Sequence, residues 1–158
     1  MGYALLKLVH LGSAIVWIGG MFFALFCLRP AAMGLEPAVR VPFMATALGR
    51  FFAVVLWVGL AALASGVAMV VRVGQATRTT GAPFNMPADW MAMAVLGVLM
   101  LAVFGHIRFA LYKRLQRAVA AQDWPAGGAA LADIRFWVGV NLAFGALIVV
   151  VTVLGAAT

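Results

Sequence analysis

The stretch FFAVVLWVGLAALASGVAMVV, residues 51–71, decides the fold of this chain. It contains no charged residue and a single hydroxyl group, at Ser65. It is long enough to cross the hydrocarbon core of a bilayer, which takes about 20 apolar residues in a helix. Three further apolar stretches run from about 3 to 28, 90 to 112 and 136 to 154. The sequence therefore predicts an integral membrane protein with four transmembrane helices.

The composition of the whole chain agrees with this fold. Of the 158 residues, 66% are hydrophobic and 9% are charged, whereas about a quarter of a soluble domain is charged. We expect a single all-α domain over 1–158, a four-helix bundle with helices at about 3–28, 43–73, 88–120 and 134–156. The net charge of +7 does not indicate nucleic acid, because the cations stand at the ends of apolar runs. Lipid is the expected environment.

The distribution of lysine and arginine predicts the orientation. Cytoplasmic segments of membrane proteins carry the excess of these residues. We therefore expect both termini and the loop 74–89 to lie outside, in a multi-pass protein of the bacterial inner membrane. The cytoplasmic side then holds eight cations, and the outer side three: Arg29, Arg40, Arg50, Arg108, Lys113, Arg114, Arg117 and Arg135 against Lys7, Arg72 and Arg78.

Polar groups inside the spans are expensive and so point to function. No Asp or Glu lies inside a predicted span, which argues against a carboxylate proton relay. His10 and His106 are the two histidines of the chain. Residue counts from the cytoplasmic cations put them roughly 15 to 25 Å apart in depth, at 1.5 Å per residue. A haem held by both histidines of one chain is therefore disfavoured. The polar residues near His10, here called the outer layer, and those near His106, here called the inner layer, are considered separately.

The outer layer combines an imidazole with thioethers. His10, Trp17 and Met21 fall on one face of the first helix, and Met69 and Met93 are expected at similar depth. Imidazole with thioether suits Cu(I), or a haem iron with one or two such ligands. The alternative is that His10 bonds to a neighbouring backbone and the methionines fill space in the core.

The inner layer contains His106 and Asn141, at about the same depth in the third and fourth helices. Polar pairs of this kind commonly join transmembrane helices through a hydrogen bond, and we expect one here. The competing hypothesis is a second metal or haem site in which His106 is a ligand and Arg108 holds a propionate.

Two runs of sequence resemble known families. HLGSAIVWIGGMFF at 10–23 and FGHIRFALYKRL at 104–115 resemble the CopD-like family of bacterial membrane proteins, which is named for copper resistance. The spacing of His10, Trp17 and Gly20 is also similar to the first helix of the HemJ-type protoporphyrinogen oxidases, small four-helix proteins whose first-helix histidine is associated with haem b. That resemblance implies His10 as a haem ligand, with Trp17 and Gly20 shaping its pocket. Gly20 alternatively allows close helix packing.

Three hypotheses about function follow. The first is a haem b protein for electron transfer or haem handling, with His10 as principal axial ligand. The second is a copper-binding or copper-transporting protein that uses His10 and the outer methionines. The third is a structural or assembly partner without cofactor. No catalytic residue is identified; an enzyme of this kind would be a membrane oxidoreductase. Two kinds of partner are compatible with the sequence: a second copy of the chain in a homodimer, and a redox or copper-donor protein on the periplasmic side.

Overall fold

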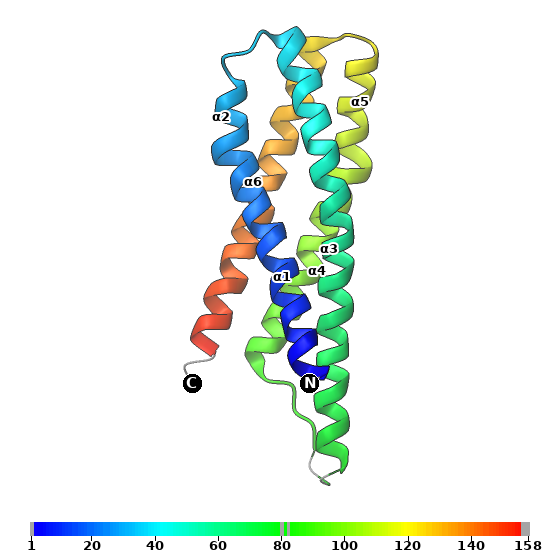
Figure 1. Cartoon of the computed structure of the whole chain (residues 1–158), viewed down its shortest axis with the longest axis vertical. Helices are drawn as coiled ribbons and strands as arrows, with labels where there is room; N and C mark the ends of the chain where they lie inside the picture. The colour runs from blue at the N-terminus through cyan, green and yellow to red at the C-terminus, as the bar shows by residue number, and fades with distance from the viewer. Residues whose placement is uncertain (1, 80, 82, 156–158) are drawn as a thin grey trace.

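The computed structural model describes residues 2–79, 81 and 83–155. This part of the chain is almost entirely helical, without strands, and has four helical rods long and apolar enough to cross a membrane (Figure 1). The predicted all-α four-helix membrane fold is confirmed. The first rod joins α1 (Gly2–Phe23), the π-helical segment η1 (Ala24–Leu28) and α2 (Arg29–Ala32), and the second is α3 (Pro37–Thr79). The third joins α4 (Ala88–His106), the π-helical η2 (Ile107–Leu111) and α5 (Tyr112–Ala120), and the fourth is α6 (Trp124–Gly155).

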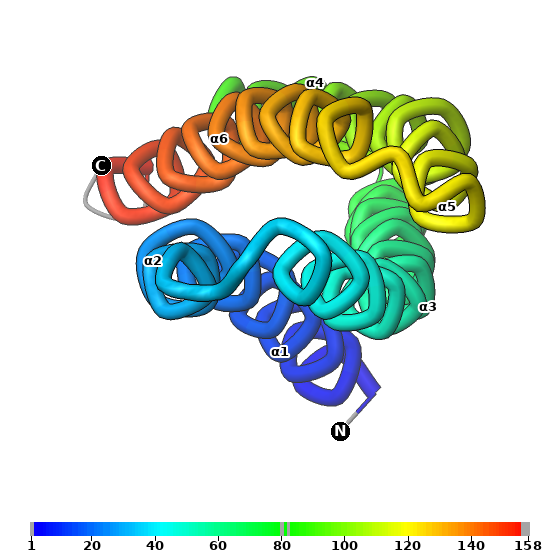
Figure 2. The backbone as a smooth tube through the Cα atoms, turned by 90° about the horizontal axis from the view of Figure 1, so that it is seen from above, coloured from blue at the N-terminus to red at the C-terminus, as the bar shows by residue number. Residues whose placement is uncertain are grey.

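The rods are arranged as two pairs (Figure 2). α1 packs chiefly on α3, and α4 packs chiefly on α6, while α6 also touches α1 and α3. The start of α1, the end of α6 and the α3–α4 connection lie at one end of the bundle, here called the terminal end (Figure 1). The opposite end holds the two short connections, 33–36 and 121–123, together with Arg29, Arg40 and Arg135; it is called the arginine-rich end.

Aromatic side chains form the centre of the core. Phe52 is 1% exposed, and its ring meets the rings of Phe104 and Tyr112 edge-on, with centroids 6.2 and 5.4 Å apart. Trp17 meets Phe104 in the same way at 5.9 Å. Edge-to-face contacts of this kind stabilise a core beyond the burial of area alone. They join α1, α3, α4 and α5 into one packed interior.

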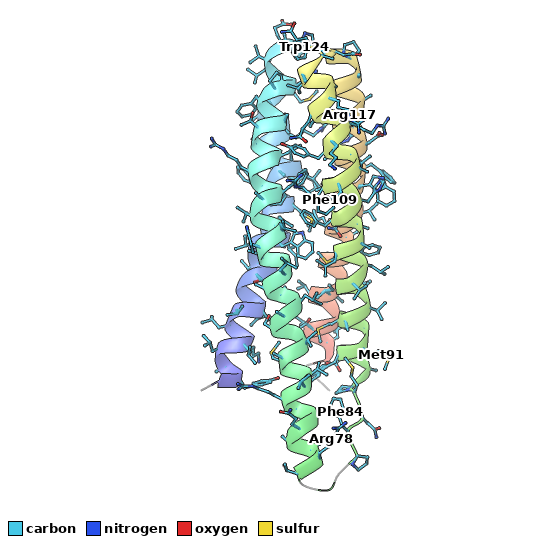
Figure 3. The ribbon with its side chains drawn as sticks, turned by 90° about the vertical axis from the view of Figure 1, so that its right-hand side faces the viewer. Arg78, Phe84, Met91, Phe109, Arg117 and Trp124 are labelled. Carbon is cyan, nitrogen blue, oxygen red and sulfur yellow. The ribbon has the colours of Figure 1, made fainter. Side chains whose placement is uncertain are left out.

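The outer surface of the rods is apolar as well. Trp57 and Ile15 are 72% and 71% exposed. Phe109 and Met91 on the third rod are also more than half exposed (Figure 3). A bundle that is hydrophobic inside and outside is stable in lipid, where all backbone polar groups are satisfied within the helices. The chain is a multi-pass membrane protein.

The fourth rod begins at Trp124, well before the expected boundary near residue 134. Asp123 explains the difference, because its Oδ1 accepts the backbone N–H of Ala126 at 2.9 Å and so caps the helix. Pro125 is tolerated in the first turn, where its missing N–H costs nothing. Gln122, with φ at +53°, ends the preceding helix. The connection between the third and fourth rods therefore shrinks to 121–123. α3 likewise exceeds the expected 43–73 at both ends.

Proline in the first rod coincides with its π-helical segment. Pro30 has no N–H to donate to the carbonyl four residues back, and its ring crowds that turn. The turn widens instead, and the N–H of Arg29 donates to the carbonyl oxygen of Ala24, five residues back. The rod therefore continues to Ala32 and does not end near Leu28 as expected.

Two glycines bring helices close together at the arginine-rich end. A Cβ on Gly127 of α6 would lie 2.6 Å from Cγ1 of Val41 on α3. A Cβ on Gly49 of α3 would collide with the hydroxyl oxygen of Tyr112. That hydroxyl donates to the carbonyl oxygen of Ala45 at 3.0 Å and is buried. Small residues at such contacts allow the backbones to approach.

Candidate functional site

His10 lies between α1 and α3, toward the terminal end. Its Nδ1 is 2.8 Å from the carbonyl oxygen of Ala62 and 3.3 Å from Oγ of Ser65. Because a carbonyl oxygen only accepts, Nδ1 carries the proton and donates it to Ala62, which leaves the lone pair on Nε2. Gly66 makes room for the ring, since a Cβ there would lie 3.2 Å from Cε1 of His10. His10 therefore does form a hydrogen bond to a neighbouring backbone, which was one of the two alternatives for this residue considered from the sequence.

The same hydrogen bond prepares the ring for a metal. Metal-binding histidines usually donate their other ring N–H to a carbonyl or carboxylate oxygen, which fixes the tautomer and the direction of the ligating nitrogen. Nε2 of His10 has no hydrogen-bond partner in the described part of the chain. The backbone bond and metal binding are thus compatible.

The two outer methionines are placed differently. Met69 follows Ser65 by one turn on the same face of α3, about 6 Å further toward the terminal end at 1.5 Å per residue. Met93 lies in the other helix pair, where its Sδ accepts the hydroxyl of Thr152 at 3.0 Å. Met69 therefore lies on α3, the helix that packs on α1, whereas Met93 lies between α4 and α6. The residues described contain no cluster of three or more His, Cys, Asp or Glu.

Trp17 and Gly20 make packing contacts. Trp17 is 5% exposed; its Cζ3 would lie 3.4 Å from a Cβ on Gly59, and its ring meets Phe104. Gly20 faces the ring of Phe51, with which a Cβ would collide. Side chains of α3 and α4 therefore fill the space beside both residues, and Gly20 serves the close helix packing considered from the sequence.

The hydrogen bond predicted between His106 and Asn141 is wrong. Asn141 is 1% exposed, and its Oδ1 has no hydrogen-bond partner among the described residues. His106 is exposed at the end of α4, where its ring meets that of Trp137 edge-on at 5.3 Å. The two side chains share a helix pair but point to different faces, Asn141 to the core and His106 outward. Residue counts give depth along a helix and do not give rotation about its axis.

Arg108 interacts with aromatic rings. Its Cζ lies 5.3 Å from the ring centroid of Tyr112 and 5.9 Å from that of Phe109. Its Nε is buried and makes no hydrogen bond within the described residues. A guanidinium over a ring face is attracted by the negative charge of that face. Arg108 is therefore held in place by the aromatic side chains of its own rod.

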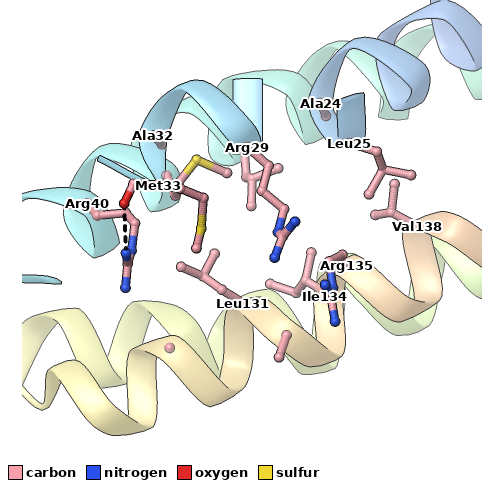
Figure 4. A pocket seen from close by; sticks show the side chains of 14 residues that line it. Ala24, Leu25, Arg29, Ala32, Met33, Arg40, Leu131, Ile134, Arg135 and Val138 are labelled. Atoms are coloured by element: carbon pink, nitrogen blue, oxygen red, sulfur yellow. Dashed lines mark hydrogen bonds between the residues drawn. The ribbon is translucent and has the colours of Figure 1, made fainter. Parts of the chain in front are cut away.

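A cavity at the arginine-rich end was not expected from the sequence. It has a volume of about 220 Å³, lies between α2, α3 and α6, and is bordered by Arg29, Arg40 and Arg135 (Figure 4). In the sequence, these arginines were signals of orientation only. Each of the three arginines lies near the end of a predicted helix, on the same side of the membrane. This shared position was the signal in the sequence that their side chains could border one cavity.

Comparison with known proteins gives one match. No curated protein and no solved structure matches the chain. The family model described as copper resistance protein D, CopD, matches residues 45–154. The chain belongs to the CopD family. The matched CopD region covers more than two thirds of the chain and includes the run 104–115 quoted above. It does not include α1, so the role of His10 within the CopD family stays a prediction.

Proposed function

We propose that this CopD-family protein handles copper at the membrane, binding it as Cu(I) through Nε2 of His10. Copper is the substrate in this proposal. The family name refers to copper resistance, and this places the copper hypothesis ahead of the haem hypothesis that the sequence put first.

The observation that carries the proposal is the hydrogen bond from His10 to α3. Donation from Nδ1 to the carbonyl of Ala62 over 2.8 Å holds the imidazole in one orientation. The lone pair of Nε2 can then coordinate a metal cation. Met69 on the same side of α3 offers a thioether, and a neutral imidazole with a thioether is a soft ligand set that favours Cu(I).

The proposed orientation predicts from which side of the membrane copper reaches His10. With eight cations toward one side and three toward the other, the positive-inside rule puts the terminal end of the bundle outside. His10 lies eight residues after Gly2, about 12 Å along α1 at 1.5 Å per residue. We therefore expect copper to reach His10 from the periplasmic side of the inner membrane, from a donor protein or as the free ion.

Haem b has less support. A haem pocket shaped by Trp17 and Gly20 would require Phe51 and Phe104 to move, because their rings lie against these residues. The site would also need to open between α1 and α3, the two helices that pack most extensively on each other. A haem nevertheless has a distinct visible spectrum, so the experiment that tests copper also tests haem.

The test compares three proteins purified in detergent: the unchanged chain, His10→Ala and His106→Ala. Cu(I) affinity is measured by competition with a chromophoric chelator, and a visible spectrum of each sample records any haem. We expect His10→Ala to lose the bound Cu(I) while eluting as the same folded species. His106→Ala removes the other histidine from an exposed position and should bind as the unchanged protein does.

Met69→Leu provides a second comparison. It keeps the volume nearly constant and removes the thioether, so Cu(I) affinity should fall if Met69 is a ligand. Unchanged copper content in His10→Ala would overturn the proposal and favour the structural role of this histidine. A Soret band that His10→Ala abolishes would restore the haem hypothesis.

A further inference from the structure

The cavity at the arginine-rich end has an apolar interior and a cationic rim. Leu25 of η1 and Val138 of α6 face each other across its inner part, and Leu131 and Ile134 continue the α6 wall (Figure 4). Met44 and Leu48 of α3 also line the cavity. Nothing in this lining except the three arginines carries a charge. The cavity therefore suits a molecule with an apolar part and an anionic part.

The rim arginines have no anionic partner among the residues that the structure describes. The ion pair at this end joins Arg114 to Asp133 at 3.4 Å and leaves the rim out. Arg40 donates to the carbonyl oxygen of Met33 at 3.5 Å. Arg29 and Arg135 form neither a hydrogen bond nor an ion pair within the described residues.

Acidic residues near this end do not change that balance. Asp133 is paired with Arg114, and Asp123 caps α6. Glu36, in the connection before α3, is exposed and forms no ion pair within the part of the chain that the structure describes. Like charges around one space repel each other at short range. An anion between Arg29 and Arg135 would remove this repulsion and satisfy both guanidinium groups.

We propose that the cavity binds an acidic phospholipid, with its phosphate between Arg29 and Arg135 and the first part of an acyl chain along Leu25 and Val138. Basic pockets between transmembrane helices on the cytoplasmic side bind such headgroups. A volume of about 220 Å³ is below the roughly 300 to 1,000 Å³ of sites that enclose a whole drug-sized ligand. It holds a phosphate and a few methylenes, and the rest of the tails lies on the apolar outer surface.

A lipid is favoured over free phosphate because most of the lining is apolar. A hydrated inorganic anion would leave the apolar side chains of Leu25, Leu131 and Val138 without an apolar partner, whereas the acyl chain of a lipid packs against them. The position also fits, since Arg29 directly follows the apolar run 3–28 and Arg135 directly precedes the apolar run 136–154. The leaflet, taken here as cytoplasmic, follows from the orientation proposed above. A bound lipid would tie α2 to α6.

The test is native mass spectrometry of the full chain in a neutral detergent, titrated with phosphatidylglycerol or phosphatidylcholine. The unchanged protein should retain phosphatidylglycerol and not phosphatidylcholine. Arg29→Gln with Arg135→Gln should weaken phosphatidylglycerol binding by about tenfold to thirtyfold, at roughly 1 kcal/mol for each cation. Lys113→Gln with Arg117→Gln is the matched control: it also removes two cations from the same end, at exposed positions of α5 outside the cavity lining.

A second variant tests the cavity without changing charge. Ala132→Phe places a ring in the cavity lining and should block lipid binding while all three arginines stay. Inorganic phosphate at millimolar concentration should not displace the lipid. Equal loss in the matched control and in Arg29→Gln with Arg135→Gln would overturn the proposal in favour of a diffuse surface attraction. Lipid binding unaffected by Ala132→Phe, or full displacement by phosphate, would overturn the role of the apolar interior.

Discussion

The contact between Gly49 and Tyr112 leads to a prediction about how α3 and α5 are held together. The hydroxyl of Tyr112 donates to the carbonyl oxygen of Ala45 at 3.0 Å and occupies the space that a side chain at Gly49 would take. Gly49→Ala and Tyr112→Phe therefore disturb the same contact from opposite sides. Their effects on the free energy of unfolding should not add.

The magnitudes follow from the distances. Tyr112→Phe removes one buried hydrogen bond, which costs about 0.6 to 1.5 kcal/mol. Gly49→Ala puts a Cβ onto the hydroxyl oxygen and 3.1 Å from Cζ of Tyr112, an overpacked contact that costs about 1 to 3 kcal/mol. In the double variant the oxygen is gone, and only the tight approach to Cζ remains. The double variant should therefore be less destabilised than the sum of the single variants, by about 1 to 2 kcal/mol.

The assay is reversible unfolding in sodium dodecyl sulfate, followed by tryptophan fluorescence, for the four proteins of the cycle. Gly105→Ala serves as the control, because a Cβ at Gly105 would meet nothing within 4 Å; it should change the unfolding free energy by less than about 0.5 kcal/mol. Additivity of the two changes to within about 0.5 kcal/mol would refute the reasoning. An unchanged unfolding free energy in Tyr112→Phe would also refute it.

Two further predictions concern orientation and the core. A reporter that is active only outside the cytoplasm, fused after Thr158, should be active because of the cation asymmetry; activity of a cytoplasm-only reporter at that position would reverse the orientation. Asn141→Val should raise the unfolding free energy by about 1 kcal/mol, because Oδ1 of Asn141 is buried and unpaired within the described residues. A decrease in the same detergent assay would show that Asn141 has a stabilising partner, as its position in the sequence first suggested.

The sequence was sufficient for the fold because lipid imposes a simple condition. A helix that crosses the hydrocarbon core must be apolar over about 20 residues, and this is visible in residues 51–71 without any structure. The ends of the rods were less predictable, since they extend beyond the lipid, where hydropathy no longer decides. There the boundaries depend on local hydrogen bonds such as the cap by Asp123.

Side-chain partners were predictable only in part. The pattern singled out His10, but the carbonyl of Ala62 that orients it carries no sequence signal, because every residue has one. His106 and Asn141 do lie on two helices that pack together, as predicted. The prediction that their side chains face each other was wrong, because the rotation of a helix about its axis depends on packing. The arginines of the cavity were assigned to the cytoplasmic side, and only the fold shows that three of them border one space.

The two π-helical segments, η1 (Ala24–Leu28) and η2 (Ile107–Leu111), bear on how the length of this chain can vary. Each wide turn holds one residue more than an α-turn while the helix on either side keeps its own contacts. Loss of a single residue within either segment can be absorbed by an ordinary α-turn. The same loss elsewhere in a span would rotate every following side chain by about 100°. Sequence comparisons of relatives should therefore place single-residue gaps at these two turns, inside helices where gaps are otherwise avoided.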